Sequence, residues 1–171
     1  MPIERPTASV VICTYNRAAI LAEALTSVLA QVIPAGVSFE TIVADDGSTD
    51  DTTEVVARVA RNTRIPVRHL ALPHGGVAAA RNAGVEAARG EWVAFIDDDE
   101  MASPTWLAEL LATARRQDVD CVSGRNDLAP SQPPPFAIPE TVRKLLGDNG
   151  FMGKAGAAVL PGGLDKAAKC C

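Results

Sequence analysis

Short apolar runs rich in β-branched residues recur along the first 124 residues, and alanine-rich stretches separate them. The runs have the length of strands, and the stretches carry apolar residues three and four positions apart, as helices with one buried face do. The pattern predicts strands at 9–13, 39–44, 66–72, 91–96 and 120–124, and helices at 18–32, 51–61, 77–89 and 104–116.

Strands that alternate with helices of this length require crossover connections. The sequence therefore predicts an α/β fold with a mainly parallel sheet and helices on both faces. Ligands of such sheets bind beyond the carboxyl ends of the strands. The polar residues that follow the strands are thus candidates for function, and they are 14–17, 45–48, Gly75, Gly76 and 97–100. His74 could reach a phosphate, but it is interpreted as an exposed loop residue and is assigned no role.

The chain changes character near Arg125. Prolines break the following residues into loops around one predicted helix at 140–147. The first 124 residues contain ten arginines and no lysine, whereas the remainder holds all four lysines. We expect residues 1–124 to form the ordered core and residues 125–171 to form a loop-rich tail, either a partial acceptor region or a lid.

Composition and charge narrow the class of protein. Apolar residues make up 47% and charged residues 22%, which is typical of a globular domain. The net charge of -5 argues against a nucleic-acid partner, which needs clustered cations. No run approaches the roughly 20 apolar residues of a transmembrane segment, and the N-terminus does not resemble a signal peptide. We expect a cytoplasmic protein and leave peripheral contact with a membrane open.

The four cysteines contribute little to the functional prediction. Cys13 and Cys121 lie in apolar runs and are predicted to be small buried core residues. Cys170 and Cys171 are adjacent at the end of the chain, which fits neither zinc-ligand spacing nor a disulfide framework. We assign them no role.

Three consecutive carboxylates, Asp97, Asp98 and Asp99, end the apolar run at 91–96. They repel one another and favour a bound cation. Oxygen ligands indicate Mg²⁺ or Mn²⁺. The alternative is a solvated acidic loop. A phosphoacceptor receiver domain also clusters aspartates around Mg²⁺, but it needs a lysine after a late strand, and residues 1–143 contain none.

Three segments, VVICTYNR, ETIVADDGSTDDT and GGVAAARNAGVEAARGEWVAFIDDDEMASPTWLAEL, resemble family 2 glycosyltransferases in order and spacing over residues 8–124. The resemblance implies a GT-A fold and a nucleoside-diphosphate sugar donor, with a UDP-sugar expected. It also implies a bound Mn²⁺ or Mg²⁺ and sugar transfer with inversion to an acceptor hydroxyl. The acceptor (a saccharide, a lipid or another hydroxyl) stays open, as does a homo-oligomer.

The resemblance also assigns residues to the nucleobase side of the site. Thr14 and Tyr15 would flank the base, and Asp46 would accept a hydrogen bond from a ring N–H such as that of uracil. The alternative for Asp45 and Asp46 is that one of them stabilises the turn. Arg81 would face the phosphates or the base. Its alternative is a surface helix charge.

In the acidic motif, the resemblance places Asp97 near the ribose and Asp99 on the metal, while Asp98 is the less defined member. The family's general base is an acidic residue well downstream. GGLD at 162–165 matches part of the stretch that precedes the base, so Asp165 is a candidate, but no acid follows it. The catalytic residue is otherwise unassigned. The alternative function is a non-catalytic or truncated nucleotide-sugar-binding module that lacks the base.

Overall fold

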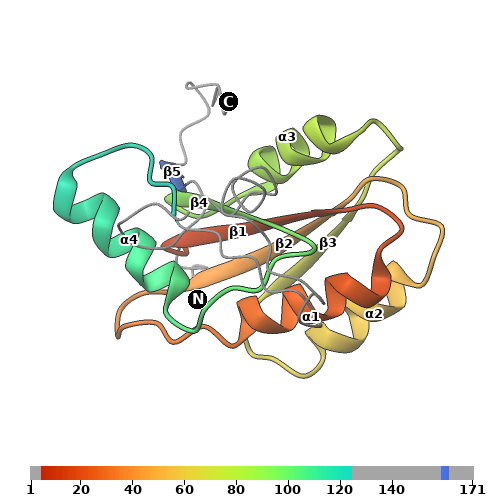
Figure 1. Cartoon of the computed structure of the whole chain (residues 1–171), viewed down its shortest axis with the longest axis horizontal. Coiled ribbons are helices and arrows are strands. Elements are labelled where there is room, and N and C mark those ends of the chain that lie inside the picture. The colour runs from red at the N-terminus through yellow and green to blue at the C-terminus, as the bar shows by residue number, and fades with distance from the viewer. Residues whose placement is uncertain (1–4, 125–158, 162–171) are drawn as a thin grey trace, which may run out of the picture.

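The structure, a computed structural model, describes residues 5–124 and 159–161. Strands and helices alternate along the chain as far as α4 (Figure 1). The elements are β1 (Ala8–Thr14), α1 (Ala18–Leu29), β2 (Phe39–Asp45), α2 (Thr52–Ala60), β3 (Val67–Ala71), α3 (Val77–Ala87), β4 (Trp92–Asp97), α4 (Trp106–Gln117) and β5 (Val159–Pro161).

The strands form one sheet in the order β3-β2-β1-β4-β5. The first four strands are parallel, and β5 pairs antiparallel with β4. The predicted α/β fold with a mainly parallel sheet is confirmed. Because β2 lies on one side of β1 and β4 on the other, the strand order reverses at β1. In open α/β sheets this is where a ligand crevice forms, beyond the carboxyl ends of the strands.

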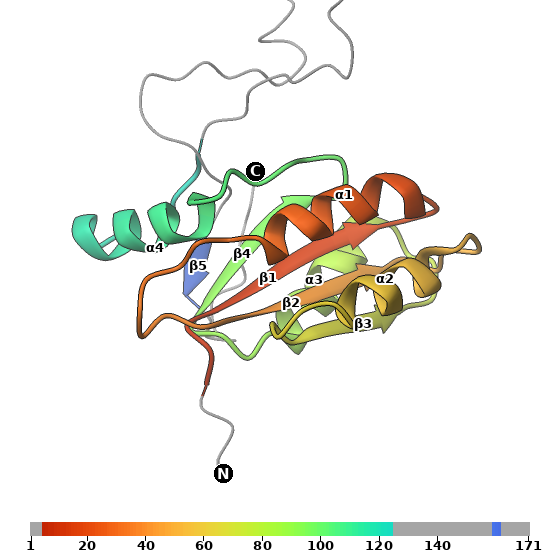
Figure 2. The same cartoon turned by 90° about the horizontal axis from the view of Figure 1, so that it is seen from below.

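Helices cover both faces of the sheet, as predicted. Figure 2 shows α1 and α2 on one face and α3 on the other. The larger core cluster joins the first face to α1, α2 and α4, and among its members are Ile12, Leu21, Leu25, Leu107 and Leu110. Burying each such side chain contributes about 1.5–3 kcal/mol to folding. Val11 points to the opposite face and belongs to the smaller cluster beneath α3.

The alanine- and glycine-rich sequence of α3 lets this helix lie close to the sheet. A Cβ added at Gly84 would stand 2.4 Å from Val11 Cγ1, so no larger residue fits without movement. Ala80, one turn earlier, is fully buried. The close approach brings Arg81, next to Ala80, to the carboxyl end of the sheet.

The prediction of a fifth strand at 120–124 is wrong. Within these residues only Val122 makes a strand-like bridge, and the fifth strand is β5. The run at 120–124 holds a single large apolar residue and follows Asp118, whose φ of 51° turns the chain away from α4. The sheet is therefore not confined to residues 1–124. The predicted helix at 140–147 lies outside the described residues.

Most other boundaries agree with the prediction within two residues. The exception is α1, which ends at Leu29 and not at 32. The Val32 N–H donates to the Pro104 carbonyl oxygen at 2.8 Å instead of continuing the helix. The prediction that Cys121 is buried is also wrong, since it is exposed, while Cys13 is half-buried. In the part of the chain that the structure describes, no helix has the length and apolar character needed to cross a membrane.

Candidate functional site

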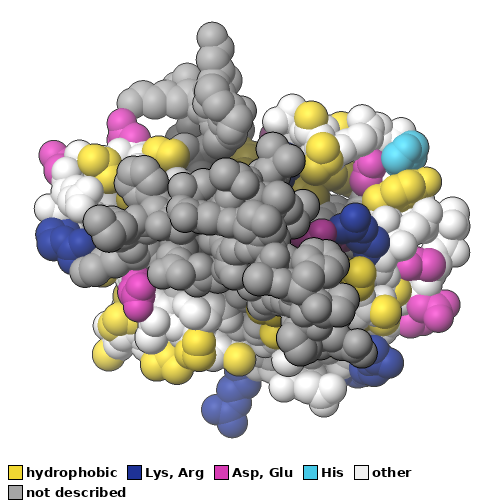
Figure 3. Space-filling model, viewed as in Figure 1, with side chains coloured by type: hydrophobic (Ala, Val, Ile, Leu, Met, Phe, Trp, Pro, Cys, Tyr) yellow, Lys and Arg dark blue, Asp and Glu magenta, His cyan; other side chains and the backbone are white. Residues whose placement is uncertain are grey.

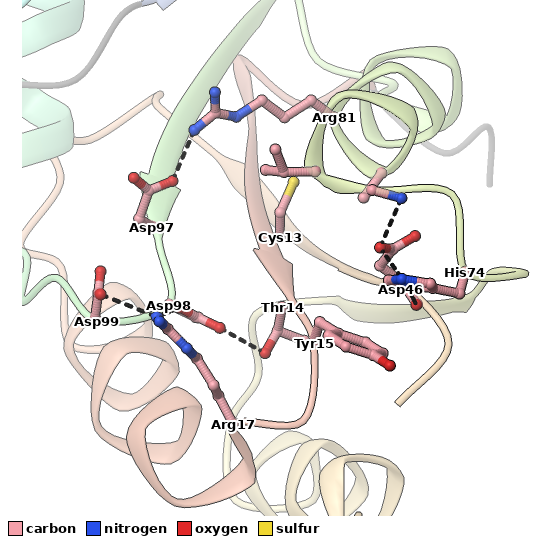
Figure 4. A pocket seen from close by; sticks show the side chains of 13 residues that line it. Cys13, Thr14, Tyr15, Arg17, Asp46, His74, Arg81, Asp97, Asp98 and Asp99 are labelled. Atoms are coloured by element: carbon pink, nitrogen blue, oxygen red, sulfur yellow. Dashed lines mark hydrogen bonds and ion pairs between the residues drawn. The ribbon is translucent and has the colours of Figure 1, made fainter. Parts of the chain in front are cut away.

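A pocket of about 430 Å³ opens at the carboxyl end of the sheet, between the ends of β1, β2 and β4 and the start of α3 (Figure 4). All seven residues that the sequence assigned to donor or metal binding line it, although they come from four separate segments. They are Thr14, Tyr15, Asp46, Arg81, Asp97, Asp98 and Asp99. Asp165 lies outside the described residues. Figure 3 shows acidic, basic and histidine side chains at this end of the molecule.

Hydrogen bonds between the loops after β1 and β2 fix one rim of the pocket. Asn16 adopts a φ of 53°, and its backbone N–H donates to Ser48 Oγ at 2.9 Å. The Thr49 N–H donates back to Asn16 Oδ1 at 2.7 Å. The Ala18 N–H, in the first turn of α1, donates to Asp50 Oδ2 at 2.9 Å. The loop after β2 thus supplies the capping acceptor that α1 does not carry itself.

Asp50 serves α2 as well as α1. Its Oδ1 accepts hydrogen bonds from the Thr52 hydroxyl at 2.6 Å and from the Thr52 N–H at 3.2 Å. The bond from the Thr52 hydroxyl and the bond from the Ala18 N–H hold the pKa of the Asp50 carboxyl below its usual value. The charged carboxylate therefore joins the starts of two helices.

Asp46 anchors the loop between β3 and α3. Its two carboxylate oxygens accept the N–H groups of Gly75 at 2.7 Å and of Gly76 at 2.9 Å. The Gly75 N–H is the main reason that the pKa of Asp46 lies below its usual value, and the Gly76 N–H and His74 act in the same direction, against burial. Gly76 has a φ of 88°, which a residue with a side chain rarely adopts. The turn after β2 is stabilised instead by Asp45, whose Oδ1 accepts the Ser48 N–H at 2.9 Å.

His74 has a defined position in the pocket. Its ring stacks on the Tyr15 ring with a centroid distance of 4.3 Å and an interplanar angle of 22°. Its Nδ1 lies 2.9 Å from Asp46 Oδ2. The side chain is 59% exposed, so the stack stands at the open edge of the pocket. One face of Tyr15 is thereby covered by another flat, polar ring.

Arg81 and Asp97 face each other across the pocket. Arg81 Nη2 donates to Asp97 Oδ1 at 2.9 Å, and both side chains are about half exposed. The ion pair joins α3 to the end of β4. A solvent-exposed ion pair of this kind is weak, so both groups can exchange it for a ligand.

Asp98 and Asp99 share one guanidinium. Arg17 Nη1 donates to Asp98 Oδ1 and to Asp99 Oδ2, each at 3.0 Å. Asp98 is buried, and its Oδ2 accepts the Thr14 hydroxyl at 2.7 Å. The Asp98 carboxylate raises the pKa of the Arg17 guanidinium above its usual value, and Asp99 adds to the effect. Arginine side chains therefore offset part of the acidic charge for which the sequence predicts a bound cation.

The donor set fits a divalent cation that arrives together with a substrate. Within residues 5–124 and 159–161, no three His, Cys, Asp or Glu side chains converge to hold a metal ion by themselves. Magnesium-type ions commonly use one or two carboxylates and complete their shell with substrate phosphates and water. Asp99, with a side chain 54% exposed at the pocket wall, offers such a carboxylate.

Cys13 lines the pocket below the polar rim. Burial raises the pKa of its thiol to about 11; Arg81 opposes this shift, and Asp97 adds to it. The thiolate is the nucleophilic form of cysteine, so Cys13 is a neutral wall group at physiological pH.

Six of the pocket residues have no role assigned from the sequence, and they are Arg17, His74, Cys13, Gly76, Val77 and Ala80. Arg17 follows Tyr15 by two positions in the polar segment after β1, and this placement was the available signal. The sequence predicts no role for His74, because a histidine beside two glycines does not indicate its stacking partner. The sequence predicts that Cys13 belongs to the core, because the alternation of a strand does not show where the core ends and the pocket begins.

Known structures share this architecture. The chain matches S. aureus TarS 1-349 in complex with UDP with a TM-score of 0.64 and 28% identity, over 76% of this chain and 38% of that one. It matches the mannosyltransferase PcManGT from Pyrobaculum calidifontis, in complex with GDP-Man and Mn²⁺, with a TM-score of 0.66 and 29% identity, over 74% and 37% of the two chains. These similarities confirm the predicted GT-A-type fold.

Sequence comparisons agree with the structural ones. The succinoglycan biosynthesis protein ExoM of Rhizobium meliloti (strain 1021) is 33% identical over 124 residues, which are 72% of this chain and 40% of that protein. The chain thus spans well under two thirds of the length of this relative. The model of the glycosyl transferase family 2 matches residues 9–157. The resemblance found in the sequence is confirmed, and the chain belongs to glycosyltransferase family 2.

Proposed function

We propose that this chain binds a nucleoside-diphosphate sugar, specifically a UDP-sugar, together with a divalent cation, and that the protein transfers the sugar to an acceptor hydroxyl with inversion. The observation that carries the proposal is the pocket itself. Seven residues from four segments of a family 2 chain converge at the strand ends, where ligands of such sheets bind.

The charge of the pocket supports a cation cofactor. Four carboxylates and two guanidiniums line it, which leaves an excess of negative charge. A diphosphate is also negative, so it enters favourably only with a positive ion. Asp99 would hold this ion together with the diphosphate. A bound divalent ion neutralises the charge that develops on a departing diphosphate and is worth several kcal/mol in general.

Tyr15, His74 and Asp46 form the proposed nucleobase side. Aromatic rings bind bases by stacking, and Tyr15 is 44% exposed at the pocket mouth. The Asp46 oxygens each accept one backbone N–H, and a carboxylate has about four acceptor positions in all, so Asp46 retains capacity for a base N–H. The complex of TarS with UDP supports uridine, whereas PcManGT forms its complex with GDP-Man.

Arg81 and Asp97 complete the proposed donor site. Asp97 can accept hydrogen bonds from ribose hydroxyls, and Arg81 can donate to phosphate oxygens. Their ion pair holds the two side chains next to each other at the pocket wall before the donor arrives.

In the proposed reaction, the acceptor oxygen attacks the anomeric carbon while the bond from this carbon to the diphosphate oxygen breaks. Attack from the face opposite the leaving group inverts the anomeric centre. The acceptor hydroxyl loses its proton to a base. The four carboxylates of the pocket are each engaged with an N–H, a hydroxyl or a guanidinium. Asp165 remains the predicted candidate for the base.

Calorimetric titration with UDP, CDP, ADP and GDP, in Mn²⁺ and in a chelator, tests the donor proposal. We expect UDP to bind measurably only with the cation present. Asp99→Asn is expected to weaken cation-dependent binding more than Asp98→Asn, whose main effect is expected on stability because Asp98 is buried. Asp51→Asn, at an exposed position at the start of α2, is the matched control. Unchanged UDP affinity in the chelator would refute the cation assignment.

A second experiment tests the transfer. A panel of UDP-sugars with saccharide and lipid acceptors is followed by NMR, which reports the anomeric configuration of the product. Inversion supports the proposed displacement, whereas a product with retained configuration contradicts it.

A further inference from the structure

Arg17 occupies the place between Asp98 and Asp99 in the pocket wall (Figure 4). A single nitrogen, Nη1, donates to both carboxylates at 3.0 Å. Arg17 comes from the loop after β1, and the two acids follow β4. The side chain thus brings a positive charge to the carboxylate that is proposed to hold the divalent ion.

The two contacts of Arg17 differ in strength. The Asp98 side chain is 8% exposed, and the Thr14 hydroxyl also holds it. The Asp99 side chain is 54% exposed, and the Arg17 side chain is 49% exposed. Water screens the Asp99 contact strongly, as it does other surface ion pairs, whereas the Asp98 contact is shielded. A competing cation would therefore separate Arg17 from Asp99 before it separated Arg17 from Asp98.

We propose that Arg17 is a resident counter-cation of the acidic cluster, which holds Asp99 until the divalent ion and the diphosphate bind and then remains on Asp98 alone. This inference rests on the proposed function and adds a positioning residue to it. Removing Arg17 has two opposite consequences. Asp99 becomes more available to the ion, because the competing guanidinium is gone. The diphosphate loses a nearby positive charge.

The first measurement follows Mn²⁺ binding without nucleotide. Mn²⁺ is titrated into the millimolar range, and the paramagnetic broadening of backbone amide signals around Asp99 reports its occupancy. We expect Arg17→Gln to tighten Mn²⁺ binding about two- to fivefold, the range for removal of one exposed ion pair. Arg17→Lys retains the charge and is expected to stay near wild type. Arg64→Gln makes the same charge change at an exposed loop position before β3 and serves as the control.

The second measurement is UDP binding by calorimetry at saturating Mn²⁺. Arg17→Gln is expected to weaken it about two- to fivefold, while Arg64→Gln leaves it unchanged. Opposite shifts of the two affinities are the signature of the counter-cation. A merely structural role would weaken both, and thermal melting curves of each variant identify a folding defect directly.

The inference is overturned if Arg17→Gln leaves the Mn²⁺ affinity unchanged, lowers it, or produces no broadening near Asp99. The proposed function fails separately, if wild-type protein binds no UDP in the presence of Mn²⁺. The titration without nucleotide still decides the role of Arg17 in that case.

Discussion

The hydroxyl of Thr14, the last residue of β1, donates a 2.7 Å hydrogen bond to Oδ2 of Asp98, which follows β4. The two strands are neighbours in the sheet. Their last paired residues are Cys13 and Asp97, each one position before a residue of this hydrogen bond. The contact therefore continues the pairing of β1 and β4 beyond the last bonded residues, through side chains. It sets where the acidic cluster stands relative to the loop that carries Tyr15 and Arg17.

Thr14→Val is expected to lower the free energy of unfolding by about 1.5–3 kcal/mol, because a buried carboxylate loses a hydrogen-bond donor. Urea unfolding measures the loss. Thr53→Val, at an exposed position on α2, is the control and is expected to change stability little. Equal effects of the two substitutions would mean that the Thr14 bond contributes nothing specific.

Asp46→Ala is expected to reduce the preference for UDP over CDP, because uracil offers a ring N–H to a carboxylate where cytosine offers an acceptor. The measurement is the ratio of the two affinities by calorimetry with Mn²⁺. The substitution also releases the N–H groups of Gly75 and Gly76, so both affinities are expected to fall. If both fall by the same factor, Asp46 shapes the loop and does not contact the base.

Gly84→Ala is expected to destabilise the protein by about 1–3 kcal/mol, as overpacking does. The direction of the change is informative, because a Gly→Ala substitution in a helix with free space around it stabilises the protein by about 1 kcal/mol. The added Cβ would stand 2.4 Å from Val11 Cγ1. In the double variant Val11→Ala/Gly84→Ala, the shortened side chain at position 11 leaves room for the added methyl group. Urea unfolding is therefore expected to show a loss of stability smaller than the sum of the losses of the two single variants. Additive costs would contradict the contact as their cause.

Acid is expected to loosen the loops around the pocket. The pKa values of Asp46 and Asp50 lie below the ordinary value of 3.8 in the folded protein. A lowered pKa contributes stability above the unfolded value, and this contribution is lost as the pH falls through the folded value. The contribution of these two carboxylates to the free energy of unfolding is therefore expected to stay constant from pH 7 to about 5 and to decrease below about pH 4.

Asp50→Asn tests this pH dependence. It is expected to be less stable than wild type at pH 7 and to lose less stability between pH 5 and 3, because the amide does not titrate. Urea unfolding at several pH values gives both slopes. Identical slopes would show that Asp50 has the same pKa in the folded and unfolded chains.

Much of the candidate site could be predicted from the sequence because parallel strands end at one edge. Polar residues at the ends of β1, β2 and β4, or one or two positions beyond them, must lie there, and Thr14, Asp46 and Asp99 do line the pocket. The partners of these residues could not be predicted in the same way. The contact of Arg17 with two acids depends on the left-handed turn at Asn16 and on the directions of the side chains. Neither feature produces a repeating pattern of residues that could be recognised in the sequence.

The fifth strand shows another limit of sequence patterns. Val159–Pro161 is a three-residue strand, too short for alternation to be recognised, and it pairs antiparallel with a strand more than 60 positions earlier. The run at 120–124 has a more strand-like composition but ends as a single bridge at Val122. Which of two short segments joins an edge is decided by tertiary contacts rather than by local preference.

The mutual hydrogen bonds between residues 16–18 and 48–50 have a consequence for engineering. Each loop supplies hydrogen-bond acceptors to the other, so the two loops form one exchangeable unit although the bonded residues lie 32 or 33 positions apart in the sequence. A chimera that grafts residues 46–51 from another family member must carry the matching residues 15–18 with it. Grafting one loop alone would leave the start of α1 without its acceptor and would move Tyr15 and Arg17 together.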